Sequence, residues 1–270
     1  LEYHLAKAFL HYWLGDSDKA LAELAAHSEV ASTLGAMSRL AANAYLEGCV
    51  LQRRGRFEAA GEAYKRWADY WQRSGSLTRD EKAVNAVSNT LVLGLLDVSR
   101  GDVRSARTKL AQSVSLAGRA GYRFNREWNE QAGRCLAGEV LLAEGKPAEA
   151  GRELAAAAGF DYPSMTSVAE LVYYHLPAEK DALARAYKAM GETDKAIAEY
   201  KRLMTIDRTN QVRQMIPPVY HFRLAGLYED KGLKDEARAE YRKFLEIWKD
   251  ADPDRPELAE ARKRLTGLGT

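Results

Sequence analysis

The sequence has no long hydrophobic run and very little cysteine. None of its apolar stretches approaches the roughly 18 residues that a membrane-spanning helix needs, so we expect no transmembrane segment. The two cysteines, Cys49 and Cys135, cannot form a disulfide framework or a zinc-binding set. Such low cysteine content suits a reducing compartment, and it favours a soluble, folded protein of the cytoplasm.

The sequence also lacks an excess of charge of either sign. Forty basic side chains against thirty-eight acidic ones leave a net charge of +2 over 270 residues. A balance this even gives no field strong enough to attract nucleic acid or an anionic membrane. We therefore expect partners to be selected by particular faces of the molecule.

Motifs of catalysis and of metal binding are absent as well. The five histidines never fall at metal-ligand spacing with Cys, Asp or Glu, and no glycine cluster forms a phosphate-binding loop after a strand. A nucleophile elbow needs a strand, and the patterns throughout this chain are helical. The sequence accordingly predicts no enzyme, no metal and no cofactor. We expect the histidines to be packed or surface residues of helices: His4, His11, His27, His175 and His221.

The sequence does contain the pattern of a helical hairpin, and Leu183–Leu203 shows it most clearly. Ala184 lies on one helix, Gly191 ends it, and Ala196 and Tyr200 lie on a second helix that folds back. Glycine permits the left-handed backbone that terminates a helix. The small residues let the two helices approach closely, and the tyrosine covers the adjoining patch.

The same spacing recurs six times along the chain. Each copy has a glycine, a small residue seven positions before it, an alanine five after it and a large apolar residue nine after it. The glycines are separated by 40 to 46 residues, which is the period of a helical-repeat protein. They are Gly15, Gly55, Gly101, Gly145, Gly191 and Gly232. The corresponding alanines are Ala20, Ala60, Ala106, Ala150, Ala196 and Ala237.

This spacing resembles the tetratricopeptide repeat. The last two copies match that family well, with Tyr187 and Tyr228 four residues before their glycines, whereas the first four copies have His11, Leu51, Asp97 and Leu141 there. Family repeats are about 34 residues long, so the helices or connections here must be longer. The resemblance implies an all-α, right-handed superhelix of about six hairpins with a C-terminal capping helix.

Breaks in the repeat pattern predict how this solenoid is divided. We expect four hairpins in residues 1–158, an irregular joint with a short helix in 159–176, and two hairpins with the capping helix in 177–270, all in one continuous solenoid. Turn-forming residues interrupt the pattern at Gly159–Thr166. We expect the second helix of the first hairpin to span Asp18–Ser28.

The C-terminal tail, Trp248–Leu265, resembles the ends of tetratricopeptide regions attached to bacterial serine/threonine kinases and related signalling regulators. Leu1 already stands inside a helical pattern. These features favour a fragment of a larger bacterial signalling protein, with a kinase or another signalling domain attached on its N-terminal side.

The family resemblance also implies a concave groove lined by the first helix of each hairpin. Its matching positions are mostly apolar early in the chain and charged later, which suits an extended or helical peptide. The groove residues are Leu5, Phe9, Tyr45, Cys49, Leu91, Leu95, Cys135, Glu139, Arg185 and Phe222. The family's carboxylate clamp needs Lys and Asn where this sequence has the first four of these residues, so binding of chaperone tails is not expected.

Arginines cluster near two of the predicted inter-helix turns. They could hold an acidic or phosphorylated segment through charge-assisted hydrogen bonds. Alternatively, they are solvated residues near helix C-termini, where cations are favoured. This basic patch comprises Arg53, Arg54, Arg56, Arg119, Arg123 and Arg126.

Three functional readings follow from the sequence. The first is a non-catalytic scaffold or regulatory module that binds a protein or peptide. The second is a sensor that encloses a small molecule or short signalling peptide in a pocket lined by Tyr45, Leu91 and Cys135. The third is self-association through an exposed first hairpin that carries Phe9, Tyr12 and Trp13.

Overall fold

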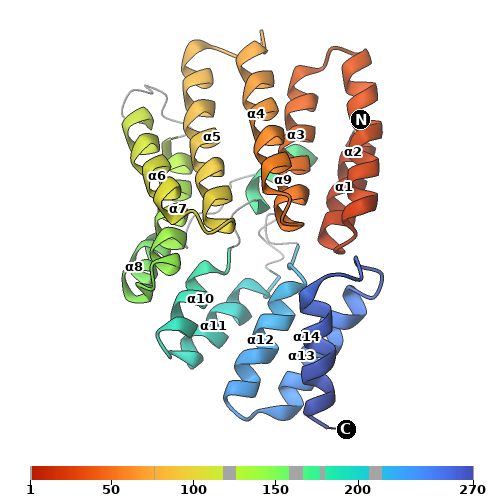
Figure 1. The fold of residues 1–270 in the computed structure, drawn as a ribbon, viewed down its shortest axis with the longest axis vertical. Helices are drawn as coiled ribbons and strands as arrows, with labels where there is room; N and C mark the ends of the chain where they lie inside the picture. Colours follow the sequence, from red (N-terminus) through yellow and green to blue (C-terminus); the bar gives the residue numbers. More distant parts are fainter. Residues whose placement is uncertain are drawn as a thin grey trace.

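The computed structural model of the protein describes residues 2–75, 77–117, 126–157, 167–176, 180–206 and 215–269, without the side chains of residues 126–128, 174 and 175. Over these ranges the chain forms fourteen helices and no strand (Figure 1). None of these helices is both long and apolar enough to cross a membrane. The helices are α1 (Glu2–Trp13), α2 (Ser17–Thr33), α3 (Met37–Arg53), α4 (Phe57–Arg73), α5 (Arg79–Ser99), α6 (Val103–Ala117), α7 (Arg126–Ala143), α8 (Pro147–Ala157), α9 (Val168–His175), α10 (Ala182–Ala189), α11 (Thr193–Leu203), α12 (Val219–Asp230), α13 (Lys234–Ile247) and α14 (Pro256–Gly267).

Twelve of these helices pair into six hairpins, α1–α2, α3–α4, α5–α6, α7–α8, α10–α11 and α12–α13, which we number one to six. The predicted all-α, tetratricopeptide-like solenoid is confirmed. The long period comes from long helices, since α5 alone has 21 residues. Helix α2 continues to Thr33, well beyond the predicted end at Ser28. The predicted break at Gly159–Thr166 lies outside the described residues.

A glycine with a left-handed backbone closes every hairpin, and φ at the six predicted glycines lies between 71° and 83°. At Gly191, the glycine N–H donates to the Lys188 carbonyl at 3.0 Å and the Glu192 N–H donates to the Tyr187 carbonyl at 2.9 Å. These two bonds satisfy carbonyls at the helix end. The position four before each glycine supplies a backbone carbonyl to the turn, so the turn itself does not require tyrosine there.

Close packing inside the hairpins explains why the spacing selects small residues. A Cβ atom added to Gly48 would lie within 3.0 Å of the Tyr64 ring, and one added to Gly138 would lie equally close to Leu154. Real Cβ atoms essentially never approach other atoms so closely. The six alanines that follow the turn glycines are all fully buried. The small and large residues of the pattern therefore pack against each other across each hairpin.

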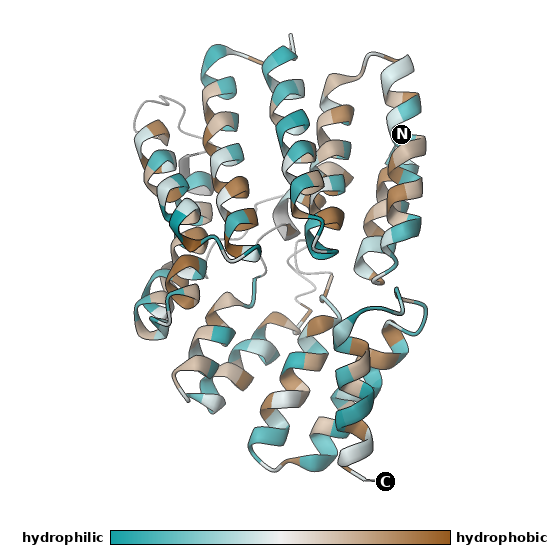
Figure 2. Ribbon diagram, viewed as in Figure 1, coloured by the Kyte–Doolittle hydropathy of each residue, from teal (hydrophilic) through white to brown (hydrophobic). Residues whose placement is uncertain are grey.

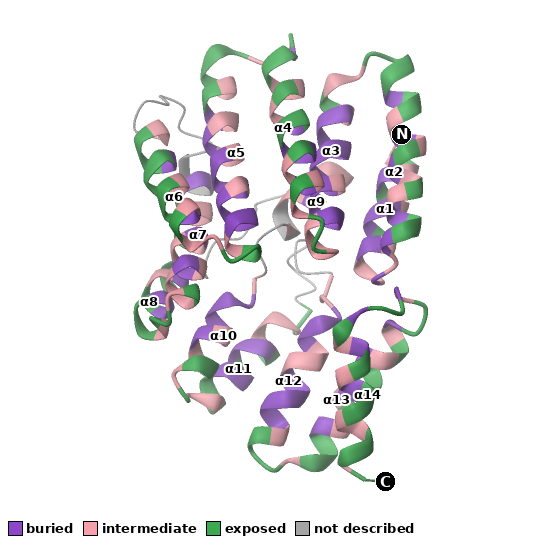
Figure 3. Ribbon diagram, viewed as in Figure 1, coloured by how far each residue is buried: buried purple, intermediate pink, exposed green. Residues whose placement is uncertain are grey.

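The buried residues form two larger and two smaller apolar clusters, and buried positions occur in both halves of the molecule (Figure 3). One large cluster lies in hairpins one and two, with side chains from α5 and α9, and includes Val172. The other lies in hairpins five and six and against α14, and includes Trp248. The exposed faces of the helices are mainly hydrophilic, as the pattern of a helical-repeat protein requires (Figure 2).

The solenoid closes on itself. Helices α1–α6 stand side by side in one half of the molecule and α10–α14 form the other half, with α7 and α8 linking them along one edge (Figure 1). At the opposite edge, the segment between α13 and α14 meets the turns of hairpins one and two. The first and last hairpins are therefore in direct contact.

Candidate functional site

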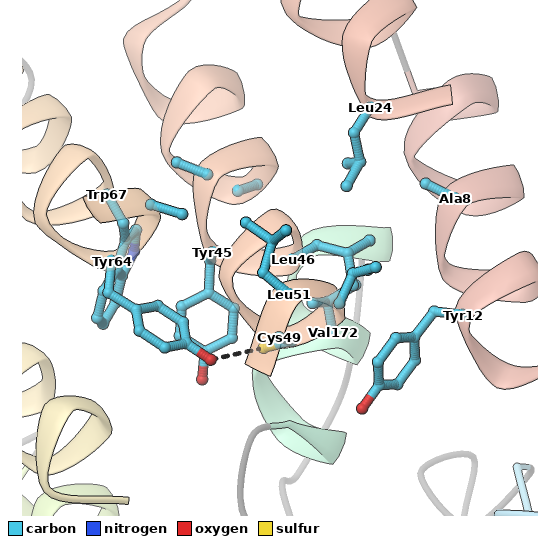
Figure 4. Packing of buried hydrophobic residues seen from close by; sticks show 14 of the residues in the cluster. Ala8, Tyr12, Leu24, Tyr45, Leu46, Cys49, Leu51, Tyr64, Trp67 and Val172 are labelled. Carbon is cyan, nitrogen blue, oxygen red and sulfur yellow. Dashed lines mark hydrogen bonds between the residues drawn. The ribbon is translucent and has the colours of Figure 1, made fainter. Parts of the chain in front are cut away.

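The apolar groove positions of hairpins one and two belong to one cluster, and Figure 4 shows Tyr45 and Cys49 within it. Their side chains are almost completely buried, with exposed fractions of 0% for Leu5, 5% for Phe9, 4% for Tyr45 and 3% for Cys49. Helix α9 packs against α1 and α3 and adds Val172 to the same cluster. The chain itself therefore fills this part of the predicted groove.

Specific contacts hold α9 over Tyr45. The Tyr45 hydroxyl donates to the Leu176 carbonyl at 2.7 Å, and its ring packs edge-on to Tyr173 with centroids 4.6 Å apart. Ser167 and Glu170 form a capping box that starts α9. Val172 is 1% exposed, so it is the main apolar anchor of this helix.

Both cysteines are shielded to different degrees. Burial raises the pKa of the Cys49 thiol to about 12, and the Tyr64 hydroxyl lies 3.5 Å from its sulfur (Figure 4). Burial also raises the pKa of Cys135, whose side chain is half-buried. Neither thiol is activated as a nucleophile, because the reactive form is the thiolate.

The groove positions of hairpin three lie elsewhere. Leu91 and Leu95 belong to a separate cluster with Leu136 and Val140 of α7. Cys135, also on α7, is outside both this cluster and the one that contains Tyr45. The three residues expected to line a sensor pocket therefore occupy different surroundings.

A charged ladder crosses hairpins four to six, where the sequence predicted a polar groove. Arg185 of α10 binds Glu139 of α7, with one nitrogen–oxygen distance of 3.1 Å, and also Asp181 at 3.2 Å. Asp181 in turn accepts from Arg223 of α12 at 2.5 Å and from the Tyr200 hydroxyl at 2.7 Å. The structure thus brings the predicted residues Glu139 and Arg185 together.

Asp181 is fully buried at the centre of this ladder. Burial acts to raise its pKa, but Arg223, Arg185 and the Tyr200 hydrogen bond outweigh it and hold the pKa below its ordinary value. Burial, reinforced by Asp181, raises the pKa of the Tyr200 hydroxyl. The carboxylate therefore stays ionised and links the three hairpins.

Arg223 belongs to this site although the sequence pattern did not predict it. It stands nine positions before Gly232, next to the predicted groove residue Phe222. Nothing local marks it as a partner of Asp181, which lies 42 positions away. Phe222 itself is half-buried and packs on Phe244, with ring centroids 5.4 Å apart.

The structure describes the side chains of three of the six arginines in the basic patch: Arg53, Arg54 and Arg56. Arg54 pairs with Asp18 at 2.5 Å and lies 3.7 Å from Asp254 and 4.0 Å from Asp252. Arg53 donates to the Tyr12 carbonyl at 2.9 Å, and its guanidinium lies 3.9 Å from the centre of the Tyr12 ring. Arg56 is exposed. Arg119, Arg123 and the side chain of Arg126 lie outside the described residues.

An acidic segment of the same chain therefore lies against Arg54. This terminal clasp, residues 248–255, makes further bonds to the first two hairpins. The Trp248 indole donates to the Trp13 carbonyl at 3.0 Å, and Arg255 donates to the Arg53 carbonyl at 3.1 Å. The Asp252 carboxylate accepts from the Ser17 N–H. Whether the patch also binds a partner stays a prediction.

The expectation of an exposed apolar edge at Phe9, Tyr12 and Trp13 is wrong. Phe9 and Tyr12 are only 5% and 8% exposed, and the half-buried Trp13 indole donates to the Ile216 carbonyl at 3.0 Å. The terminal clasp and the interior of the molecule cover this region. The large apolar residues that hairpin one does expose are Tyr3, Leu10 and Val30.

Metal-binding geometry is absent from the described part of the chain, where no group of three or more His, Cys, Asp or Glu side chains could hold an ion. The site that remains consists of two inner regions. One is apolar and covered by α9, and the other is charged and spans hairpins four to six.

Part of the chain resembles a known repeat family. A family model described as tetratricopeptide repeat matches residues 181–210 and 219–248, which contain hairpins five and six. No curated protein matches the sequence. Among solved structures, a tetratricopeptide repeat protein from Parabacteroides merdae aligns over 100% of this chain and 98% of its own, with 14% identity and a TM-score of 0.44.

Proposed function

We propose that this chain, which carries tetratricopeptide-like repeats, is a non-catalytic scaffold that binds protein or peptide partners. Repeats of this kind generally mediate protein–protein interaction. Their stacked hairpins present extended surfaces that suit a peptide or a helix. The proposal rests on hairpins five and six, which match the family and present a mixed apolar and charged inner region.

The observation that carries the proposal is a difference between two aromatic residues at equivalent repeat positions. Tyr45 stands ten positions before Gly55, and Phe222 stands ten before Gly232. Tyr45 is covered by α9, whereas Phe222 is only half-buried. Accessible aromatic side chains are common anchors at protein interfaces.

Two arginines on the first helices of hairpins five and six add positive charge to this region. The Arg185 and Arg223 side chains are 30% and 28% exposed, although each also pairs with Asp181. A surface that offers a half-buried aromatic ring and partly exposed guanidinium groups suits a peptide that carries both apolar and acidic residues. We infer that hairpins five and six take a partner segment of this kind.

We further infer that the module regulates or localises a signalling protein. The inference rests on the resemblance of the tail at Trp248–Leu265 to kinase-attached repeat regions. A kinase or another signalling domain would then lie N-terminal to the hairpins. The structure of this tail is compatible with such a role, because it folds against hairpin one and ends in α14.

Site-specific photo-crosslinking tests the scaffold function. A photoreactive phenylalanine analogue replaces Phe222, and in a matched control it replaces Tyr3, which is 66% exposed on α1. After irradiation in cells that naturally make the protein, we expect the Phe222 probe to capture one or a few partner proteins that the Tyr3 probe does not. Identical capture patterns from the two probes would contradict a partner site on hairpins five and six.

The sensor alternative gains no comparable support. It required a pocket shared by Tyr45, Leu91 and Cys135, and these residues occupy different surroundings in the structure. Around Tyr45, α9 already occupies the groove. The observations therefore favour the scaffold.

A further inference from the structure

A cavity of about 460 Å³ lies between the end of α4 and the beginning of α5, where hairpins two and three meet (Figure 1). This volume is within the usual range for binding sites of small molecules. The cavity opens to solvent, and most of its lining is apolar. Its lining residues are Gln72, Leu77, Arg79, Lys82, Ala83 and Ala86.

Small residues of α5 leave room for this cavity. Ala86 stands fifteen positions before its turn glycine, Gly101, and Ala83 stands eighteen positions before it. In hairpin two, the same positions relative to the turn glycine hold Leu40 and Met37. Leu40 is only 6% exposed, so the preceding repeat uses this position to bury a large side chain. Helix α5 therefore lacks bulk that the repeat pattern readily accommodates.

The cavity carries positive charge, and no acidic residue of the described chain lines it. Arg79 and Lys82 stand three positions apart, so they share one face of α5. Neither side chain forms an ion pair within the described residues. The Glu81 carboxylate is bound in the capping box that begins α5, and Asp80 is turned about 100° around the helix from Arg79. Both cations can therefore receive an anion from outside.

The walls of the cavity are held in place without a ligand. The Gln72 amide donates to the Lys82 carbonyl at 3.1 Å, which bridges α4 and α5. Thr78 and Glu81 form the capping box that fixes the first turn of α5. A site with fixed walls loses little conformational entropy when a ligand enters, so more of the contact energy contributes to affinity.

We propose that this cavity binds a small amphiphilic anion, that is, an acidic group on a short aliphatic chain. The acidic group accepts charge-assisted hydrogen bonds from Arg79 and Lys82. The chain lies on the apolar lining formed by Leu77, Ala83 and Ala86. This site goes beyond the scaffold function and does not depend on it, because hairpins five and six contribute no residue to the cavity.

Isothermal titration calorimetry with octanoate tests the site, and octanamide is the matched neutral probe. At about pH 7.5 octanoate is ionised, so we expect it to bind at least about tenfold more tightly than octanamide. Octyl phosphate is the second acidic probe, and comparison with octanoate shows which acidic group the two cations prefer. In nuclear magnetic resonance spectra, the amide shifts caused by binding should be largest at residues 77–86.

Two kinds of variant separate the apolar lining from the charge. Ala86→Leu and Ala83→Met fill the cavity with the residues that hairpin two has at these positions, and each should weaken octanoate binding at least about tenfold while the helical circular-dichroism signal is kept. Arg79→Gln combined with Lys82→Gln should abolish the preference for octanoate over octanamide. Arg104→Gln is the control, because it removes an exposed cation of α6 that does not line the cavity.

Three results would overturn the proposal. One is the absence of binding by both acidic probes, and another is equal affinity for octanoate and octanamide. The third is full octanoate affinity in both cavity-filling variants, which would place the ligand elsewhere on the protein. Because these measurements use only the chain and small molecules, they are independent of partner capture at Phe222, and either idea can fail alone.

Discussion

The carboxylate of Asp252 accepts hydrogen bonds from the backbone N–H of Ser17, at 3.1 and 3.2 Å, although 235 positions separate the two residues. Ser17 is the first residue of α2, where backbone N–H groups have no partner within the helix and a negative charge is favoured. In return, the Asp252 N–H donates to the Gly15 carbonyl at 3.1 Å. The terminal clasp therefore completes the first hairpin of the chain.

Replacing Asp252 by Ala should open this contact. The Ser17 N–H loses its acceptor in a site where Asp252 is only 7% exposed, so we expect a loss of about 2 kcal/mol in the free energy of unfolding. Urea denaturation measures the loss, and small-angle X-ray scattering should show a larger radius of gyration. Asp254→Ala is the matched control, since the Asp254 side chain is 70% exposed. Equal effects of the two substitutions would contradict the role of the buried carboxylate.

Gly48→Ala should destabilise hairpin two. The added methyl group would lie within 3.0 Å of the Tyr64 ring, which is itself completely buried, so the helices must move apart. We expect a loss of about 1–3 kcal/mol by chemical denaturation. Gly133→Ala in α7 is the control, because nothing lies within 4 Å of its added Cβ and alanine favours a helix by about 1 kcal/mol. A Gly48→Ala protein as stable as the Gly133→Ala protein would rule out the proposed close contact.

Stability should fall as the pH drops below about 6.5, because of His27. This side chain is completely buried, and burial, with a smaller effect of His4, lowers its pKa to about 4. Asn43 lies against it, with the amide nitrogen 3.0 Å from Nδ1, and Nε2 has no partner in the described residues. Since the unfolded chain binds the proton more readily, each pH unit between about 6.5 and 4 should cost up to about 1.4 kcal/mol.

Urea midpoints measured at pH 7.0 and 5.0 check this expectation. His27→Gln removes the titrating group while keeping a polar side chain, so its midpoint should change less between the two pH values than that of the wild type. His4→Gln is the comparison, since His4 is one-third exposed and pairs with Glu23. The same pH slope in wild type and His27→Gln would exclude His27 as the cause.

Asp181→Asn should weaken the joint between hairpins four, five and six. The substitution leaves Arg185 and Arg223 without the carboxylate they share, and removal of one member of a buried ionic network costs about 3 kcal/mol. Asp194→Asn is the control, because its side chain is 82% exposed and its pair with Lys231 is worth at most about 1 kcal/mol. Thermal denaturation of the two variants should differ clearly in midpoint.

The stabilising contribution of Asp181 to this joint should be lost in acid. The folded-state pKa of Asp181 is lowered, so its contribution is present above the ordinary carboxyl pKa and is lost as the pH falls through the lower, folded-state value. Wild type should therefore lose stability in acid relative to Asp181→Asn. A constant difference between the two proteins down to strongly acidic pH would contradict the ionised state of Asp181.

The repeat architecture was predictable because its requirements are local. A left-handed turn needs glycine, and two crossing helices need small residues at fixed distances from that turn, so Gly191 and its neighbours carry the information within one hairpin. The register also located Tyr45 and Arg185 on the first helices of their hairpins, the side on which α9 and the charged ladder lie. Helix lengths were less well predicted, since the expected end of α2 at Ser28 overlooked Gly35, whose left-handed backbone (φ 61°) follows the actual end of the helix at Thr33.

The cover over the groove and the closure of the solenoid could not be predicted in the same way. Both depend on pairs that are distant in sequence: Tyr45 with Leu176, and Ser17 with Asp252. Val172 and Asp252 have no local feature that separates them from other valines and aspartates of the chain. Their roles arise only when the accumulated rotation of successive hairpins brings the segments together.

Closure also limits how this protein can change during evolution. An open array of repeats gains or loses a unit without disturbing the others, because each unit contacts only its neighbours. Here the turn at Gly15 must meet Trp248 and Ala251, which already leave no room for a Cβ atom on that glycine. Duplication or deletion of a single hairpin would rotate the two ends out of register, so the number of repeats should be conserved among relatives that retain the clasp.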